Sequence, residues 1–287
     1  MNARGFTLVE LLVASAGLLV TMAFVAAVAV PLRDGFERSL GAADLTGGSR
    51  TVLERLAGEI REAGARASVG GGRLADVVPP IVPMATIDSA IWADPGQAFR
   101  VTRVPLLAPQ GRLLADVAAG SITVTLDTTN RCTAVGAGCG LRAGMTALLY
   151  DTVHAEAVTV SLVAAGVVRF DAPLTSAFSA GAVLVSATFT AYGLRPAPDG
   201  AFRLVRSTGA SEQPLIDDVV DFRVRVVGAD PLHAKQVELL LRLEAPSETM
   251  RGPAGRLFRR PGSALRTAAW VPDVETRTTV ALRNGAG

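Results

Sequence analysis

Few side chains in this chain are placed to do chemistry, and the most informative of them is a carboxylate. Glu10 stands directly before residues 11–32, a run of 22 residues without a charged side chain. As a helix this run would be about 33 Å long, enough to cross a hydrocarbon layer of ~30 Å. A carboxylate at the start of such a segment is costly in lipid and is usually functional. Glu10 is therefore the first candidate functional residue.

The only two cysteines, Cys132 and Cys139, enclose the segment CTAVGAGC. In an oxidising compartment they could form a disulfide that closes a loop of eight residues and contributes at most about 2.5 kcal/mol. The glycines between them let the sulfurs approach, and the alternative is two free thiols in a flexible turn. Two cysteines without a nearby histidine do not supply the four ligands of a structural zinc, so no metal or other cofactor is expected.

The other titratable residues form no recognisable catalytic pattern. His154 and His233 are isolated from any serine or cysteine at a familiar spacing, and surface or core positions are expected for both. Asp217, Asp218 and Asp221 lack the glycine and distal glutamate of an EF-hand loop, so they predict a turn before a strand. The motifs GxSxG, HExxH and the Walker loop do not occur. The sequence thus predicts neither an enzyme nor a small-molecule substrate.

A group of arginines lies in the segment MRGPAGRLFRRPGSALR, interrupted by Phe258. Such a group could hold nucleic-acid phosphates while the aromatic ring stacks on a base. A solvated loop between two strands is the favoured interpretation, because prolines and glycines flank the segment and the net charge of the chain is only +2. The group comprises Arg251, Arg256, Arg259, Arg260 and Arg266.

The segment GFTLVE at residues 5–10, with the apolar run behind it, resembles the class III signal of type IV prepilins and type II secretion pseudopilins. The resemblance implies that a membrane-bound prepilin peptidase removes the leader 1–5 by cutting after Gly5 and methylates the new amino terminus on Phe6. It also implies that Glu10 matches the terminal amine of a neighbouring subunit. Glu10 would then be an assembly contact and not a catalyst.

Two other interpretations of this amino-terminal segment remain open. A conventional signal peptide has an apolar core of about 7 to 15 residues, which the present run exceeds. A simple signal anchor leaves Glu10 unexplained. Arg4 and Arg33 lie at opposite ends of the run, so charge does not decide its orientation. The resemblance implies a single pass through the inner membrane with a periplasmic head, and later a place in a pilus or pseudopilus.

The assembly helix, residues 6–32, is expected to continue as an amphipathic helix over residues 33–66. Leu53, Leu56 and Ile60 share one face at helical spacing and predict a buried contact. The opposite-charge pairs Arg55 with Glu59 and Glu62 with Arg66, four residues apart, are expected on the surface. Pro31 either bends the helix or ends its membrane part, and Gly47 with Gly48 should weaken it.

Beyond the glycines at 70–72 the hydrophobic period changes to that of strands, as in VVDFRVRVV and SITVTLD. Residues 67–287 are therefore expected to form a β-rich head. Within it, residues 111–190 contain short strands and glycine-rich turns, which predict an inserted small β-barrel or β-roll. The expected fold class is α+β. LAGEIREAG and the carboxyl-terminal strands resemble PilW-type minor pilins and, more distantly, the J-type minor pseudopilin, which implies a pilin-like architecture.

This resemblance covers about half of the chain and implies a minor pilin in a complex that initiates or caps a type IV pilus. Its expected partners are other minor and major pilins, the prepilin peptidase and the inner-membrane assembly platform. Three alternatives stay open: a minor pseudopilin of type II secretion, a tip-displayed adhesin or DNA-binding module, and an enzyme on a membrane anchor. The nearly balanced charge gives no argument for a nucleic-acid partner.

Overall fold

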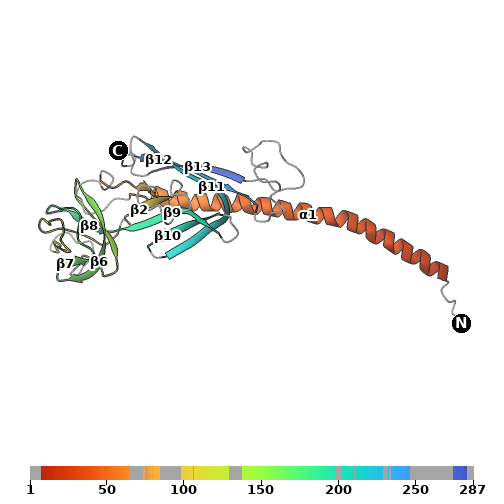
Figure 1. Cartoon of the computed structure of the whole chain (residues 1–287), viewed down its shortest axis with the longest axis horizontal. Helices are drawn as coiled ribbons and strands as arrows, with labels where there is room; N and C mark the ends of the chain where they lie inside the picture. The colour runs from red at the N-terminus through yellow and green to blue at the C-terminus, as the bar shows by residue number, and fades with distance from the viewer. Residues whose placement is uncertain are drawn as a thin grey trace. The chain divides into compact units, whose positions relative to one another are not determined.

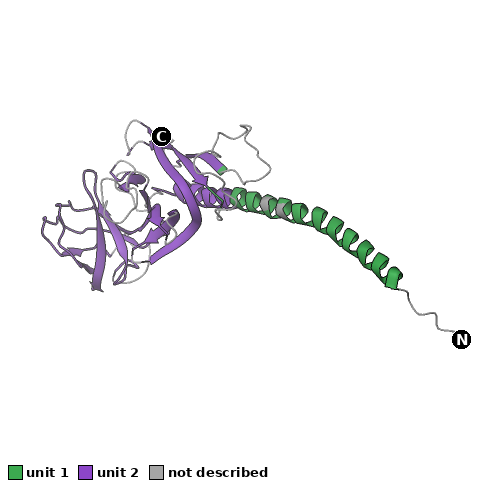
Figure 2. Ribbon diagram, turned by 45° about the vertical axis from the view of Figure 1, so that its right-hand side comes forward, with its two compact units in different colours: residues 1–47, 244–274 green, residues 48–243, 275–287 purple. Residues whose placement is uncertain are grey.

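The structure, a computed structural model, describes residues 8–64, 74, 77–84, 98–105, 107–128, 138–197, 202–209, 211–228, 232, 234–245 and 274–282. It divides into two compact units, which Figure 2 shows in different colours: residues 1–47 with 244–274, and residues 48–243 with 275–287. One long amino-terminal helix is followed by a chain rich in strands (Figure 1). The predicted α+β class is confirmed.

The helix α1 runs from Leu8 to Arg61 without interruption, so Pro31 does not divide it into two helices. Proline removes one hydrogen-bond donor, but good helix formers lie on both sides, among them Leu32, Glu37 and Leu40 after it, and the helix continues. Gly47 and Gly48 do not interrupt α1 either. At Gly48, close packing against the sheet leaves little room for a side chain. A Cβ there would lie 3.1 Å from the Cδ1 atom of Ile216 on the sheet.

The helix ends before the predicted residue 66. Residues 62–64 form a turn, in which Gly64 adopts a left-handed φ of 63°. Such a glycine commonly terminates a helix, because it carries no Cβ to clash in that conformation. The Gly64 amide then donates a hydrogen bond of 2.9 Å to the carbonyl oxygen of Thr102, which joins the helix end to a strand.

A seven-stranded sheet follows the helix. From β1 to β12 its neighbouring strands pair antiparallel, and β2 pairs directly with β9, so the segment between them is an insertion in this sheet. In spatial order the strands are β1 (Ile81–Pro83), β2 (Phe99–Arg103), β9 (Thr188–Pro196), β10 (Phe202–Thr208), β11 (Ser211–Gly228), β12 (Ala234–Leu243) and β13 (Val274–Ala281).

The last turns of α1 are buried in the unit that contains this sheet. The predicted contact face is confirmed, since Leu53, Leu56 and Ile60 are all buried. The inner face of the sheet supplies an aromatic core in which the ring of Phe99 stacks on that of Tyr192 at 5.1 Å. Burial of apolar side chains from both the helix and the sheet stabilises this helix–sheet packing.

The insertion forms a second, six-stranded half-barrel sheet over residues 110–186. Its end strands β3 and β4 are joined by a bridge between Leu113 and Leu126 and by a hydrogen bond of 2.8 Å from the Leu114 amide to the Thr125 carbonyl oxygen. Residues 188–190, predicted to belong to this module, begin β9 of the other sheet instead. The spatial order is β3 (Gln110–Arg112), β8 (Val183–Ser186), β5 (Thr146–Tyr150), β6 (Ala155–Ala164), β7 (Val167–Phe170) and β4 (Thr123–Thr125).

The three aspartates do not form the predicted turn before a strand. They lie inside β11, where its pairing registers shift and Asp218 adopts a left-handed φ of 57°. Asp217 pairs with Arg203 at 3.2 Å, and Asp221 pairs with Arg223 at 2.9 Å. Short polar residues such as aspartate are common both in turns and at irregularities inside long strands. Composition alone therefore could not distinguish a turn from a strand irregularity at this position.

Candidate functional site

The amino-terminal part of α1 presents a long, largely apolar surface. Its large apolar side chains are exposed from the first turn onward, and this stretch is long and apolar enough to cross a membrane. An apolar surface of this extent in water marks a contact with lipid or with other protein. The exposed side chains are Leu8, Val9, Leu11, Leu12, Val13, Leu18, Leu19, Val20, Met22, Phe24, Val25, Val28, Val30 and Leu32.

The hydroxyl groups inside this apolar stretch are satisfied within the helix. Ser15 donates a hydrogen bond of 3.0 Å to the carbonyl oxygen of Leu12. Thr21 donates to the carbonyl oxygens of Gly17 and Leu18 at 3.0 and 2.9 Å. Polar groups bonded in this way need no water, which suits a helix placed in hydrocarbon.

Glu10 lies in the first turn of α1 and its side chain is exposed. An acidic residue in the first turn is favourable in itself, because it lies near the positive end of the helix dipole. The next charged residue along this helix is Arg33, which pairs with Glu37 at 2.9 Å. The helix therefore presents one carboxylate, then an uncharged stretch, then an exposed ion pair. Gly5 and Phe6 lie outside the described residues, so cleavage and methylation there stay predictions.

A polar cluster, formed by Glu59, Tyr192 and Arg206, lies where the last turns of α1 meet the sheet. Glu59 accepts hydrogen bonds from the Tyr192 hydroxyl and, at 3.1 Å, from Arg206. Arg55 lies 3.9 Å from the same carboxylate, as its spacing predicted. The expected surface position of Glu59 is wrong, because its side chain is only 19% exposed and faces the sheet. Glu62 pairs with Arg103 at 2.8 Å, and Arg66, its predicted partner, lies outside the described residues.

In the folded protein the pKa of each of the two tyrosines lies above the ordinary tyrosine value of about 10. Burial raises the pKa of Tyr150 to about 12, although the charge of Arg112 opposes the shift. Burial also raises the pKa of Tyr192, and the hydrogen bond and charge of Glu59 add to that effect. A tyrosine with a higher pKa in the folded state stabilises the fold fully below its unfolded pKa of about 10. That contribution is lost as pH rises above this value.

We therefore expect neither tyrosine to ionise near pH 10 in the folded protein. Absorbance at 295 nm of the detergent-solubilised chain should stay flat through that pH and rise only when the head unfolds at higher pH. The chain has two tyrosines in total, so the signal is not masked by others. A rise with a midpoint near 10, with circular dichroism still native, would show that these hydroxyls are accessible to water.

Replacing Glu59 with alanine should lower the free energy of unfolding of the head by about 1 to 3 kcal/mol, because the Tyr192 hydroxyl and the Arg206 guanidinium lose their shared acceptor. The matched control is Glu62→Ala on the same helix end. The Glu62 side chain is 56% exposed in its pair with Arg103, so its loss should cost at most about 1 kcal/mol. Urea unfolding followed by circular dichroism checks both values, and equal losses would contradict the assigned role of Glu59.

Cys139 is buried and disulfide-bonded, and it packs in the core of the half-barrel sheet. Its contact with β3 is close, since a Cβ added to Gly111 would lie 2.9 Å from the Cys139 Sγ atom. Cys132 lies outside the described residues, so its pairing with Cys139 stays a prediction. The buried sulfur places this bond inside the module, away from the apolar part of α1 in sequence.

The remaining candidates take structural positions where they are described. The His154 amide donates a hydrogen bond of 2.7 Å to Asp151, and its ring lies edge-on to Phe178. His233 and the arginine group at residues 251–266 lie outside the described residues. In the part of the chain that the structure covers, no three His, Cys, Asp or Glu side chains gather closely enough to hold a metal ion.

The chain matches no protein-family model and no curated protein. The resemblance of GFTLVE to the prepilin signal therefore depends on the residues of this chain alone.

Proposed function

We propose that this protein is a pilin-like assembly subunit, a minor pilin of a type IV pilus. The proposal depends on the difference between the two ends of α1. The helix exposes uncharged and mostly apolar side chains over residues 11–32, and its last turns, which include Leu56 and Ile60, are buried in the unit that contains the sheet. A helix anchored in a head at one end and apolar at the other suits lateral packing with like helices. The GFTLVE motif before it supports the same function.

The proposal gives Glu10 the role of setting the register between subunits. Cleavage after Gly5 would create a positive amine on Phe6, close in sequence to the carboxylate. In an apolar environment a charge is tolerated when an opposite charge lies within hydrogen-bonding range. A neighbouring subunit whose amine arrives at the level of Glu10 neutralises it, and other registers leave both charges in lipid. Apolar packing supplies the contact area, and the ion pair selects the alignment.

Under this proposal the processed protein is held in the inner membrane before assembly, with its β-rich head in the periplasm. It then joins other minor pilins, through helix packing, in the complex that initiates or caps the filament. The assembly platform would be its partner in the membrane, and the prepilin peptidase its processing enzyme. The long apolar helix supports a single membrane span by length and composition.

A minor pseudopilin of type II secretion is the second candidate, because the same helix and motif would serve a secretion filament. Deletion of the gene in the native host separates the two. We expect the deletion strain to lose surface pili while it still secretes folded exoproteins, and the full-length gene to restore the pili. Lost secretion with pili intact would assign the chain to the secretion filament, and loss of neither would contradict both functions.

A further inference from the structure

The half-barrel sheet has two largely apolar outer faces, and this chain covers one of them. Leu149 on β5 points into the core of the sheet, so Leu148 and Tyr150, its neighbours in the strand, point outward. Both are nonetheless buried, because segments from outside the half-barrel sheet join them in one apolar cluster. This face therefore needs no further partner. The covering residues are Leu74, Val78, Val104 and Ala108.

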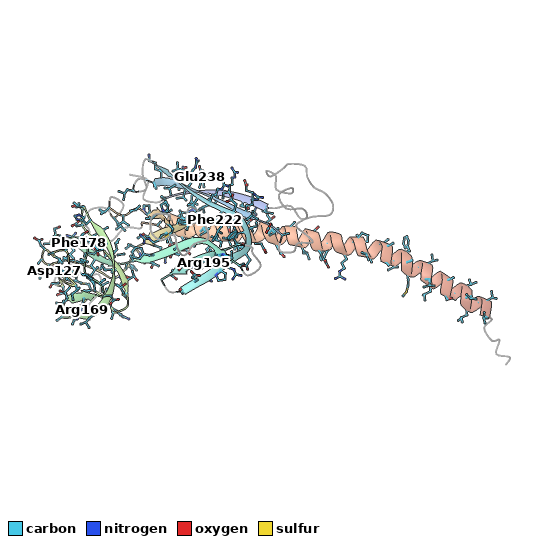
Figure 3. The ribbon with its side chains drawn as sticks, in the orientation of Figure 1. Asp127, Arg169, Phe178, Arg195, Phe222 and Glu238 are labelled. Carbon is cyan, nitrogen blue, oxygen red and sulfur yellow. The ribbon has the colours of Figure 1, made fainter. Side chains whose placement is uncertain are left out.

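The second outer face is formed by β6, β7 and β4, and its side chains are exposed. Val124 and Val168 point into the core, so the residues on either side of them point outward. Thr123 pairs with Arg169, and Arg169 pairs with Leu162, so these three side chains form one row across the face. Arg169 is labelled in Figure 3. We call this face the outer patch and define it by Leu114, Thr123, Thr125, Leu162, Val167 and Arg169.

The next row of the outer patch carries more aliphatic side chains. Val167 lies between Thr125 and Ala164, and the Leu114 amide donates a hydrogen bond of 2.8 Å to the Thr125 carbonyl oxygen. Leu114, Leu162 and Val167 are 61%, 54% and 39% exposed. Single exposed aliphatic side chains need no explanation, but a group of them on neighbouring strands marks a contact surface.

Arg169 carries the one charge among the residues that define the outer patch. In the described part of the chain no aspartate or glutamate pairs with it. Its exposed guanidinium presents a planar fork of donors that matches a carboxylate. By contrast, Arg225 on β11 donates two hydrogen bonds to Glu238 and is satisfied within the chain. An arginine among apolar side chains is typical of the residues that dominate protein–protein binding.

From this arrangement we propose that the outer patch docks another protein, whose surface places a carboxylate on Arg169 and aliphatic side chains around it. The unpaired cation selects an acidic group, and burial of the aliphatic side chains supplies the contact. A lipid surface fits less well, because a single basic residue attracts an anionic bilayer only weakly. The same patch of a second copy fits less well too, since it would bring two Arg169 side chains together. The inference does not depend on the proposed filament function.

The test is site-specific photo-cross-linking of the full-length protein in its native host. The photoreactive amino acid p-benzoylphenylalanine replaces Thr125, and mass spectrometry identifies the cross-linked peptides. We expect an adduct with a different protein, on a peptide that contains an aspartate or glutamate. Arg169→Gln should lower the yield of this adduct about tenfold, within the range found for interfacial charge pairs. Arg169→Glu should abolish it, and replacement of the partner's acidic residue by arginine should then restore it.

The matched control for charge is Arg142→Gln, which should leave the yield unchanged, because Arg142 is an exposed arginine of the same module outside the outer patch. Leu162→Asp should lower the yield about tenfold. Leu107→Asp should not, since Leu107 is 90% exposed but lies outside the outer patch. No adduct, adducts only with lipid or with a second copy, or a yield that Arg169→Gln leaves unchanged would each overturn the proposal.

Discussion

Leu56→Ala is expected to lower the free energy of unfolding of the head by about 2 to 5 kcal/mol. Leu56 is fully buried, as is its neighbour Ile60 one turn later. Truncation removes the apolar contact and leaves a cavity, because the strands around it are fixed by their hydrogen bonds. Urea unfolding of the detergent-solubilised chain, followed by the strand signal in circular dichroism, measures the change.

The matched control is Leu19→Ala, the same substitution on the same helix. Leu19 is exposed within the apolar stretch, so the unfolding of the head should not change by more than about 0.5 kcal/mol. A loss at Leu56 no larger than that at Leu19 would mean that the end of α1 does not form part of the folded head.

Glu10→Gln is expected to reduce recovery of the protein in purified filaments or tip complexes by at least about tenfold. The substitution keeps the size of the side chain but removes the charge, so under the proposed function the amine of the neighbouring subunit would lose its counter-ion in an apolar environment. Removing one partner of a buried charge pair costs about 2 kcal/mol or more. Quantitative immunoblotting of filament and membrane fractions measures recovery, and the membrane level should stay unchanged.

Glu37→Gln serves as the control for this experiment. Glu37 also lies on α1, but it is exposed and pairs with Arg33 after the apolar stretch, so its loss should leave recovery near the wild-type level. Wild-type recovery of the Glu10 variant would contradict register selection by that carboxylate.

The helix and its buried face were predictable because their signals are local. Leu53, Leu56 and Ile60 repeat at the helical period, and burial of all three confirms the pattern. The alternation Phe222, Val224, Val226 likewise predicted the second half of β11. Period and burial depend on neighbours within one or two turns, and that information is present in a single sequence.

The polar contacts between elements were not predictable in the same way. Glu59 was expected on the surface as a helix-pairing residue, whereas the structure turns it toward Tyr192 and Arg206, more than a hundred residues later in the chain. The partner of such a group depends on strand order and register, which long-range packing fixes. The same holds for Arg277, whose charge acts on Glu238 only because β13 lies beside β12.

The central claim is that the apolar helix is retained in the mature protein and begins with a processed amino terminus. Mass spectrometry of the protein extracted from native membranes tests it most directly. We expect a mature chain that begins with N-methylated Phe6 and still contains residues 6–32. A water-soluble mature chain that begins after Leu32, or a membrane form that keeps residues 1–5, would contradict the account.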